Sequence, residues 1–287
     1  MTAQLVSTAD ELATSRGAAH PVAVVMTMGA LHEGHAALIR RAREVVGRPG
    51  CVIVTDFVNP TQFGAGEDFD RYPRTLDHDL AVSSMAGADL VYAPSIQEMY
   101  GSAHLDQLGD HVMIDPGSLG SILEGASRPG HFRGMLTVVA KLLHLTAPDF
   151  ALFGEKDYQQ LTLIRAMVDS LRFPVQVMGV PTVREEDGLA MSSRNRFLSK
   201  GERAEAVALS RAIQVAAEVA AQDGALAGER AGRAVLAEHS EILLDYLVVT
   251  SPELGTAVEG QGRVLVAARL GGTRLIDNVP CAIGAGT

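Results

Sequence analysis

The sequence of 287 residues has no tryptophan, two cysteines and few aromatic side chains, which make up 5% of it. Cys51 and Cys281 lie far apart without the spacing of a metal or redox motif, so we expect a reduced, cytosolic protein without a disulfide framework. Lys and Arg number 24 against 34 Asp and Glu, and the formal net charge is −10. This shortage of positive charge excludes a general binder of nucleic acids or anionic membranes.

Long hydrophobic runs are also missing, because none approaches the roughly 20 residues that a membrane-spanning helix needs. The first residues, MTAQLVSTADELATSRG, lack the charged start and apolar core of a signal peptide. We therefore expect a cytoplasmic protein with neither nucleic acid nor membrane as a partner. With 47% hydrophobic residues, the chain can bury a large core in one domain or two.

Short apolar runs alternate with amphipathic segments as far as residue 180. The apolar runs cover residues 22–27, 52–58, 89–93, 150–153 and 175–180, and segments 36–46 and 158–171 carry apolar residues at helical spacing. Strands that are apolar throughout, separated by amphipathic helices, predict a parallel sheet covered on both faces. We expect an α/β fold with a doubly wound, Rossmann-like parallel sheet. Its ligands would bind beyond the carboxyl ends of the strands.

After Pro181 the pattern changes. Segments 201–219 and 225–238 are alanine-rich and helical, and residues 243–249 form an apolar run. The stretch GRVLVAARLGGTRLIDNV then predicts two strands joined at Gly271 and Gly272. We expect two domains, a Rossmann-like domain at residues 1–183 and a smaller α+β domain at residues 184–287.

The stretch MTMGALHEGH places two histidines and two glycines between the first apolar run and the first helix. A helix N-terminus attracts anions, and imidazoles can contact phosphate or donate a proton near neutral pH. This favours a phosphate-binding role for His32 and His35. The alternative interpretation is a capping histidine beside an unrelated neighbour. A zinc site is disfavoured, because the H-E-x-x-H spacing is absent.

Polar side chains follow three other apolar runs at the same edge of the predicted sheet. The side chains are amides, which suit a polar substrate. They also include a lysine and hydroxyls beside an arginine, which suit phosphate oxygens. The residues are Asn59 and Gln62 after the second run, Lys156 and Asp157 after the fourth, and Ser192, Ser193 and Arg194 after the fifth.

MGALHEGH resembles the H-x-G-H signature of class I nucleotidyltransferases and aminoacyl-tRNA synthetase-like proteins, and MSSRN resembles their KMSKS-like phosphate loop. Together with FVNPTQF, YPRT, LEGASRPGHFRG, GEKDYQQL and DGLAMSSRN, these motifs resemble the pantoate–β-alanine ligase (pantothenate synthetase) family over residues 22–278. The resemblance implies a ligase that adenylates pantoate with ATP, releases pyrophosphate and lets the amine of β-alanine displace AMP. It also implies Mg²⁺ and a homodimer.

The same resemblance assigns roles to individual residues. His35 would donate a proton and His32 would contact phosphate, while Lys156 and Arg194 would offset negative charge. Residues 1–183 would bind nucleotide and pantoate, and residues 184–287 would act as a lid. The implied ATP-binding residues are Met28, Gly29, Ala30, Leu31, His32, Glu33, Gly34, His35, Gly154, Glu155, Lys156, Asp157, Val183, Met191, Ser192, Ser193 and Arg194. The implied residues for pantoate and β-alanine are Gln62, Gln160, Asn59 and Tyr72.

Two residues depart from the family's usual pattern. Met26 stands where the family commonly has proline, and Asp56 stands where it usually has an apolar residue. Since a carboxylate in a covered sheet needs a partner, we expect a cationic or hydrogen-bonding group beside Asp56. Two alternative functions stay open: another nucleotidyl transferase of the same fold, and a non-catalytic nucleotide-binding homologue. A tRNA synthetase is disfavoured, because the chain is short and acidic.

Overall fold

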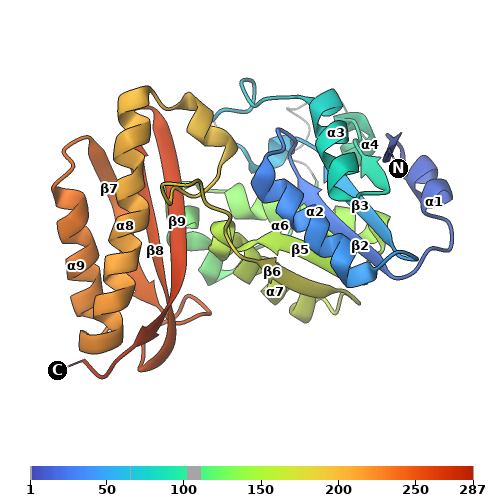
Figure 1. Ribbon diagram of the computed structural model, residues 1–287. Helices are drawn as coiled ribbons and strands as arrows, with labels where there is room; N and C mark the ends of the chain where they lie inside the picture. Colours follow the sequence, from blue (N-terminus) through green and yellow to red (C-terminus); the bar gives the residue numbers. More distant parts are fainter. Residues whose placement is uncertain (1, 65, 102–110, 287) are drawn as a thin grey trace. The chain divides into compact units, whose positions relative to one another are not determined.

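The computed structural model describes residues 2–64, 66–101 and 111–286, which form two compact units (Figure 1). The first unit comprises Met1–Gly154 and Leu163–Val180, and the second comprises Glu155–Thr162 and Pro181–Thr287. The second unit thus includes a short segment that follows the fifth strand. The assignment of residues 1–183 to substrate binding and of residues 184–287 to a lid stays a prediction.

A six-stranded sheet forms the centre of the first unit, in the order β1-β4-β3-β2-β5-β6. Every pair of neighbouring strands in it is parallel. The predicted α/β fold with a parallel sheet is therefore confirmed. The strands are β1 (Gln4–Val6), β2 (Val22–Thr27), β3 (Cys51–Asp56), β4 (Leu90–Tyr92), β5 (Phe150–Gly154) and β6 (Gln176–Val180).

Helices cover both faces of this sheet (Figure 1). The amphipathic helix α2 buries Leu38, Ile39 and Ala42 against β2 and β3 and also contacts α3, whereas α1 contacts α6. Across the described ranges, every helix is too short or too polar to span a lipid bilayer. The helices of this part of the chain are α1 (Ala9–Arg16), α2 (Glu33–Val46), α3 (Leu76–Ala86), α4 (Ile96–Tyr100), α5 (Glu124–Ser127), α6 (His131–Thr146) and α7 (Tyr158–Ser170), with 3₁₀ turns η1 (Pro60–Gln62), η3 (Ser118–Ser121) and η4 (Glu155–Asp157).

The second unit contains an antiparallel sheet in the order β7-β8-β9, with α8 and α9 packed against it. Leu270 pairs with Thr273, so the predicted hairpin turn at Gly271 and Gly272 is confirmed. Leu209 and Ile213 of α8 join Val264 and Val266 of β8 in the core. The elements are η5 (Ser193–Phe197), α8 (Lys200–Asp223), α9 (Ala225–Ala237), β7 (Ile242–Thr250), β8 (Gly260–Leu270) and β9 (Thr273–Ile283).

The packing of α6 against η1 provides a test of this fold. A Cβ added at Gly134 would overlap the carbonyl of Thr61 and lie 2.7 Å from Gln62 N. We expect Gly134→Ala to lower the free energy of unfolding by about 1–3 kcal/mol, because backbone must move to admit the methyl group. Urea denaturation followed by circular dichroism measures the change.

Gly201→Ala is the matched control for this substitution. Gly201 lies in the first turn of α8, and a Cβ there meets nothing within 4 Å. Since alanine favours a helix over glycine, this variant should gain up to about 1 kcal/mol. A Gly134→Ala protein as stable as the Gly201→Ala protein would contradict the close approach of α6 to η1.

Candidate active site

The two histidines of the first motif cap helix α2. His32 is the N-cap residue, and its Nδ1 accepts a hydrogen bond from Gly34 N at 3.1 Å. His32 N in turn donates to His35 Nδ1 at 3.2 Å, and the two ring centroids lie 4.1 Å apart. Because each Nδ1 accepts an N–H, the proton of each neutral ring is on Nε2. His32 is thus a capping residue, but His35 belongs to the same capping box and is not an unrelated neighbour. The cap leaves each ring in the form that donates from Nε2.

The loop before α2 has an unusual backbone. Gly29 has φ +76°, and Ala30 also lies in the left-handed region with φ 53°, a conformation that alanine rarely adopts. Asp79 of α3 fixes this loop, since its carboxylate accepts Ala30 N at 3.0 Å and Leu31 N at 2.7 Å. Asp79 has no exposed surface. Its role was missed in the sequence, because nothing in the spacing distinguishes it from its neighbour Asp77.

Asn59 and Gln62 lie next to this loop within the first unit. Asn59 Nδ2 donates to Gln62 Oε1 at 3.1 Å, and Gln62 Nε2 donates to Met28 Sδ at 3.2 Å. Both amides are buried, with 1% and 7% of their surface exposed. Tyr72 is buried as well, with its ring edge-on to Phe63 at 5.9 Å. The structure therefore brings the predicted residues Met28, Asn59 and Gln62 together.

His131 of α6 binds the backbone of Gln62. Arg128 Nη1 donates to His131 Nε2 at 3.1 Å, so His131 Nδ1 carries the proton and donates to Gln62 O at 2.9 Å. Burial, followed by the charge of Arg128, lowers the pKa of His131 to about 4. The ring is therefore neutral at physiological pH. Glu67 binds the same Arg128 through two hydrogen bonds.

In the second unit, the turn η4 carries Lys156 and is held by β8 and β9. Asn278 Nδ2 donates to Glu155 O at 2.9 Å and to Lys156 O at 2.8 Å. Asn278 Oδ1 accepts from Arg263 Nε at 2.7 Å, and Arg263 Nη2 binds Glu155 Oε2 at 3.0 Å. Lys156 Nζ lies 3.8 Å from Asp157 Oδ2.

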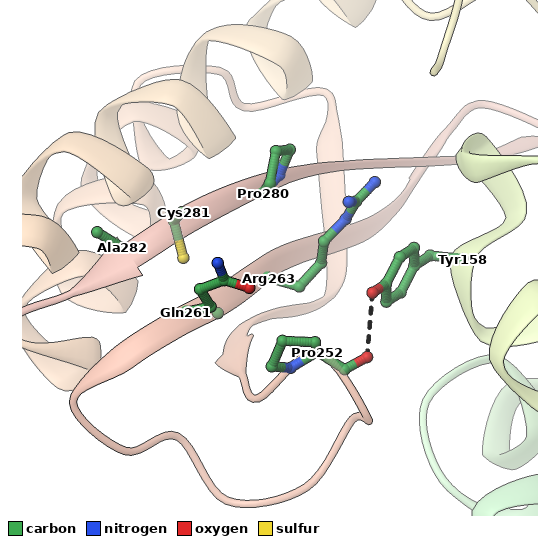
Figure 2. A pocket seen from close by; sticks show the side chains of 8 residues that line it. Tyr158, Pro252, Gln261, Arg263, Pro280, Cys281 and Ala282 are labelled. Carbon is green, nitrogen blue, oxygen red and sulfur yellow. Dashed lines mark hydrogen bonds between the residues drawn. The ribbon is translucent and has the colours of Figure 1, made fainter. Parts of the chain in front are cut away.

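Arg263 also contacts the start of α7. Its guanidinium lies 4.0 Å from the ring centroid of Tyr158, and the Tyr158 hydroxyl donates to Pro252 O at 3.1 Å. Figure 2 shows Arg263 pointing toward Tyr158 at one end of a pocket that Gln261 and Cys281 also line. Gln160, two residues further along α7, is half-buried. These contacts anchor η4 and α7 to the second sheet.

A second loop of this unit carries the predicted residues Val183 and 191–194. Met191 N donates to Val183 O at 3.0 Å, and Ser192 Oγ accepts from Arg194 N at 3.2 Å, at the start of η5. Arg184 Nη1 and Nη2 bind the buried carboxylate of Asp277 at 2.7 and 2.9 Å. Asp277 and Asn278 are neighbours on β9, so one strand fixes both loops.

Asp56, at the end of β3, lies beside the carboxyl group of Asp79, and both contact Gly29. Burial, followed by the charge of Asp79, raises the pKa of Asp56 to about 7. The partner is thus a second carboxyl group rather than a cation.

Comparison with known proteins identifies relatives along nearly the whole chain. The family described as pantoate-beta-alanine ligase matches residues 2–280. A pantothenate synthetase of a Nocardioides species is 54% identical in an alignment 292 residues long. The alignment covers 98% of this chain and 86% of the relative. A crystal structure of pantothenate synthetase from Thermus thermophilus superimposes with a TM-score of 0.87 at 47% identity, covering 96% of this chain and 98% of the other.

A more distant solved structure adds ligands to the comparison. It is a pantoate-beta-alanine ligase from Francisella tularensis, described as complexed with beta-gamma ATP and beta-alanine. Its TM-score is 0.77 at 31% identity, and the match covers 96% of this chain and 97% of the other.

The role of Asn278 can be tested through stability. Asn278→Asp keeps the shape of the side chain but replaces the Nδ2 donor with an oxygen that faces the carbonyls of Glu155 and Lys156. We expect a loss of about 1–3 kcal/mol in the free energy of unfolding, because two buried acceptors lose their donor. Gln261→Glu makes the same change at an exposed side chain of β8 and should leave stability nearly unchanged. Equal stability of the two variants in urea would contradict this support for η4.

Proposed function

The chain belongs to the pantoate-beta-alanine ligase family, and from this premise we propose that it joins pantoate to β-alanine in an ATP-dependent reaction that forms AMP and pyrophosphate. The observation that carries the proposal is the family match across residues 2–280. The ATP-derived ligand and β-alanine bound to the Francisella tularensis relative support the choice of substrates.

The reaction that we propose has two steps. The carboxylate of pantoate attacks the α-phosphorus of ATP, forming pantoyl adenylate and releasing pyrophosphate. The neutral amine of β-alanine then attacks the acyl carbon, AMP leaves with the electron pair of the acyl–oxygen bond, and the nitrogen loses a proton. The first step brings a carboxylate to a polyanion, so it requires positive groups and hydrogen-bond donors around the phosphates.

In the first unit, we assign nucleotide binding to residues 28–35. These residues lead into the N-terminus of α2, where partial positive charge favours phosphate oxygens. His32 and His35 carry their ring protons on Nε2, as their Nδ1 contacts require. They would donate these protons toward the phosphates, and His35 would stabilise charge as pyrophosphate leaves. The whole set comprises Met28, Gly29, Ala30, Leu31, His32, Glu33, Gly34 and His35.

In the second unit, we assign the remaining phosphate contacts to two loops. Lys156 and Arg194 would supply the cations, and the hydroxyls of Ser192 and Ser193 would donate hydrogen bonds to phosphate oxygens. The support for this assignment is that side chains of β9 fix both loops before any ligand binds. The other residues proposed here are Glu155, Asp157, Val183 and Met191, with Gly154 from the end of β5.

Pantoate would bind to amides rather than to a cation. Gln62 and Asn59 are buried neighbours of Met28, so pantoate held by Gln62 would lie beside the nucleotide loop. A neutral amide orients hydroxyl and carboxylate groups without forming an ion pair, which leaves the carboxylate able to attack. We propose that Gln160 and Tyr72 complete the pocket and that β-alanine enters near Gln62.

We propose that Mg²⁺ accompanies the nucleotide. Mg²⁺ usually binds substrate phosphates and water with only one or two carboxylates. We therefore expect the ion to enter the site with ATP. Among the residues that the structure describes, no group of three His, Cys, Asp or Glu side chains could hold a metal ion. When bound, it would neutralise part of the phosphate charge. Closure of a lid, a homodimer and a cytoplasmic location stay predictions.

An assay of product formation tests the proposed function. We expect AMP to form from ATP only when both pantoate and β-alanine are present with Mg²⁺. We also expect labelled pyrophosphate to exchange into ATP with pantoate alone, because the adenylate forms before the amine reacts. Exchange that required β-alanine would contradict a separate adenylation step. Exchange with CTP or with a phosphate ester instead of pantoate would identify another nucleotidyl transferase, and ATP binding without turnover would identify a non-catalytic homologue.

Lys156→Ala tests one cation of the adenylation step. The Lys156 side chain is 19% exposed at a turn whose backbone is held by Asn278. Its removal should therefore leave the fold intact and lower the rate of pyrophosphate exchange by about 10²–10³-fold, the usual effect of losing one group that stabilises developing charge. Lys200→Ala changes an exposed lysine at the start of α8 and should keep the parent's rate. Near-parental exchange in a folded Lys156→Ala protein would remove Lys156 from the mechanism.

A further inference from the structure

Two carboxyl groups lie directly beneath the loop of residues 28–31. Asp79 approaches from α3, where it also accepts the Thr75 hydroxyl at 3.0 Å, and Asp56 approaches from the end of β3. A Cβ built on Gly29 would lie 2.5 Å from Asp56 Oδ1 and 3.1 Å from Asp79 Oδ2. Both carboxyl groups therefore contact the same glycine and lie next to each other. Two adjacent carboxyl groups can form a hydrogen bond only if one of them carries a proton.

The charges around the pair favour one arrangement of this proton. Asp79 accepts two backbone N–H groups and a hydroxyl, and donors aimed at a carboxylate favour its ionised form. Within the part of the chain that the structure describes, no N–H or hydroxyl group donates to the Asp56 side chain. The proton therefore belongs to Asp56, which donates to the Asp79 carboxylate.

The other titratable groups near the pair come from four elements. Strands β2, β3 and β4 contain no Lys, Arg or His, and Tyr92 ends β4 with a pKa that burial raises to about 12. On α3, His78 Nε2 lies 3.3 Å from Leu31 O. At the start of α2 are His32 and His35. Arg74, just before α3, binds the carbonyls of Tyr72 and Phe69.

We propose that Asp56 is a positioning residue, which keeps its proton and donates it to Asp79 so that the pair holds residues 28–31 in the shape that receives the nucleotide. Only the statement that this loop receives the nucleotide rests on the proposed function. With an apolar residue at position 56, Asp79 alone would hold the loop. Asp56 adds a bond that exists only while its proton is present.

This bond makes the loop sensitive to pH in a defined direction. The carboxyl of Asp56 titrates near 3.8 when exposed, and its pKa is about 7 in the folded protein. The folded loop thus binds the proton more tightly than the opened loop, and its stability falls as pH rises from about 4 through about 7. Above about pH 8 the Asp56 carboxyl has lost its proton and no further change is expected. Between pH 6 and pH 8, linkage with these two values predicts about a tenfold loss of protection for the loop.

Hydrogen exchange of the Ala30 and Leu31 amides, measured without nucleotide and corrected for the intrinsic rate at each pH, tests the proposal. The parent protein should lose about tenfold in protection factor from pH 6 to pH 8. In Asp56→Asn the amide still donates to Asp79 but cannot ionise, so protection should change less than twofold over this range. In Asp56→Leu protection should be low and independent of pH. A parental pH dependence in Asp56→Asn would overturn the proposal.

A control variant and a direct measurement distinguish an effect of Asp56 on the pH dependence from an effect of the histidines. His78 Nε2 faces Leu31 O, and His78→Gln should keep the parental pH dependence if Asp56 causes it. Loss of the pH dependence in this variant would assign the effect to His78. Carbon-13 NMR of aspartate carboxyl groups should show one resonance that titrates near pH 7 in the parent and is missing from Asp56→Asn. The absence of such a resonance from the parent would overturn the proposal even if a variant failed to fold.

The consequence for nucleotide binding is measured separately. Between pH 6 and pH 8, the affinity for a non-hydrolysable ATP analogue should fall more in the parent than in Asp56→Asn. The fall is at most about tenfold, because the affinity follows the fraction of protein in which the loop is closed. A carboxyl titration near pH 7 with no binding of the analogue at any pH would support the pair and contradict the proposed function. Binding whose pH dependence is equal in the two proteins would contradict the positioning role while leaving the proposed function in place.

Discussion

The buried carboxylate of Asp79 is the interaction on which the loop before α2 depends. Gly29 and Ala30 both have positive φ, and for alanine such a backbone costs about 1 kcal/mol or more. Asp79 offsets this cost by accepting the N–H groups of Ala30 and Leu31 inside the protein, where unpaired donors would be expensive. The position of His32 as N-cap, and hence that of His35, follows from the path of this loop. A residue of α3 therefore controls groups proposed to contact phosphate.

Neutrality is the common property of the buried polar groups around Gln62. Asn59 and Gln62 are amides, and burial keeps His131 uncharged by lowering its pKa to about 4. Arg128, which contacts His131, is paired with Glu67. Neutral amides can hold a carboxylate and hydroxyls by hydrogen bonds without forming an ion pair. This agrees with the proposed chemistry, in which the carboxylate must attack.

The sequence predicted the elements that have a clear apolar pattern and missed those that lack one. Strands β2 to β6 were predicted because they are apolar runs, and helix α2 because its apolar residues recur at helical spacing. By contrast, β1 has three residues and α3 (LDHDLAVSSMA) has no apolar stripe. The motif residues were predicted from the resemblance to a family. Their supports were not, because Asp79, His131 and Asn278 act on residues 49, 69 and 123 positions away. Contacts over such separations are set by the fold and leave no local pattern.

The two units fix their loops by different means, and this difference has a physical reason. In the first unit the loop of residues 28–31 is held by donors that point at a carboxylate. In the second unit the loops are held by β9, where Asp277 binds Arg184 through two hydrogen bonds and Asn278 binds the carbonyls of η4. Loops that carry Lys156 and Arg194 would repel each other if those cations approached one another without an anion. Rigid support from a strand would counter such repulsion, so in the proposed reaction little ordering would be left to the binding step.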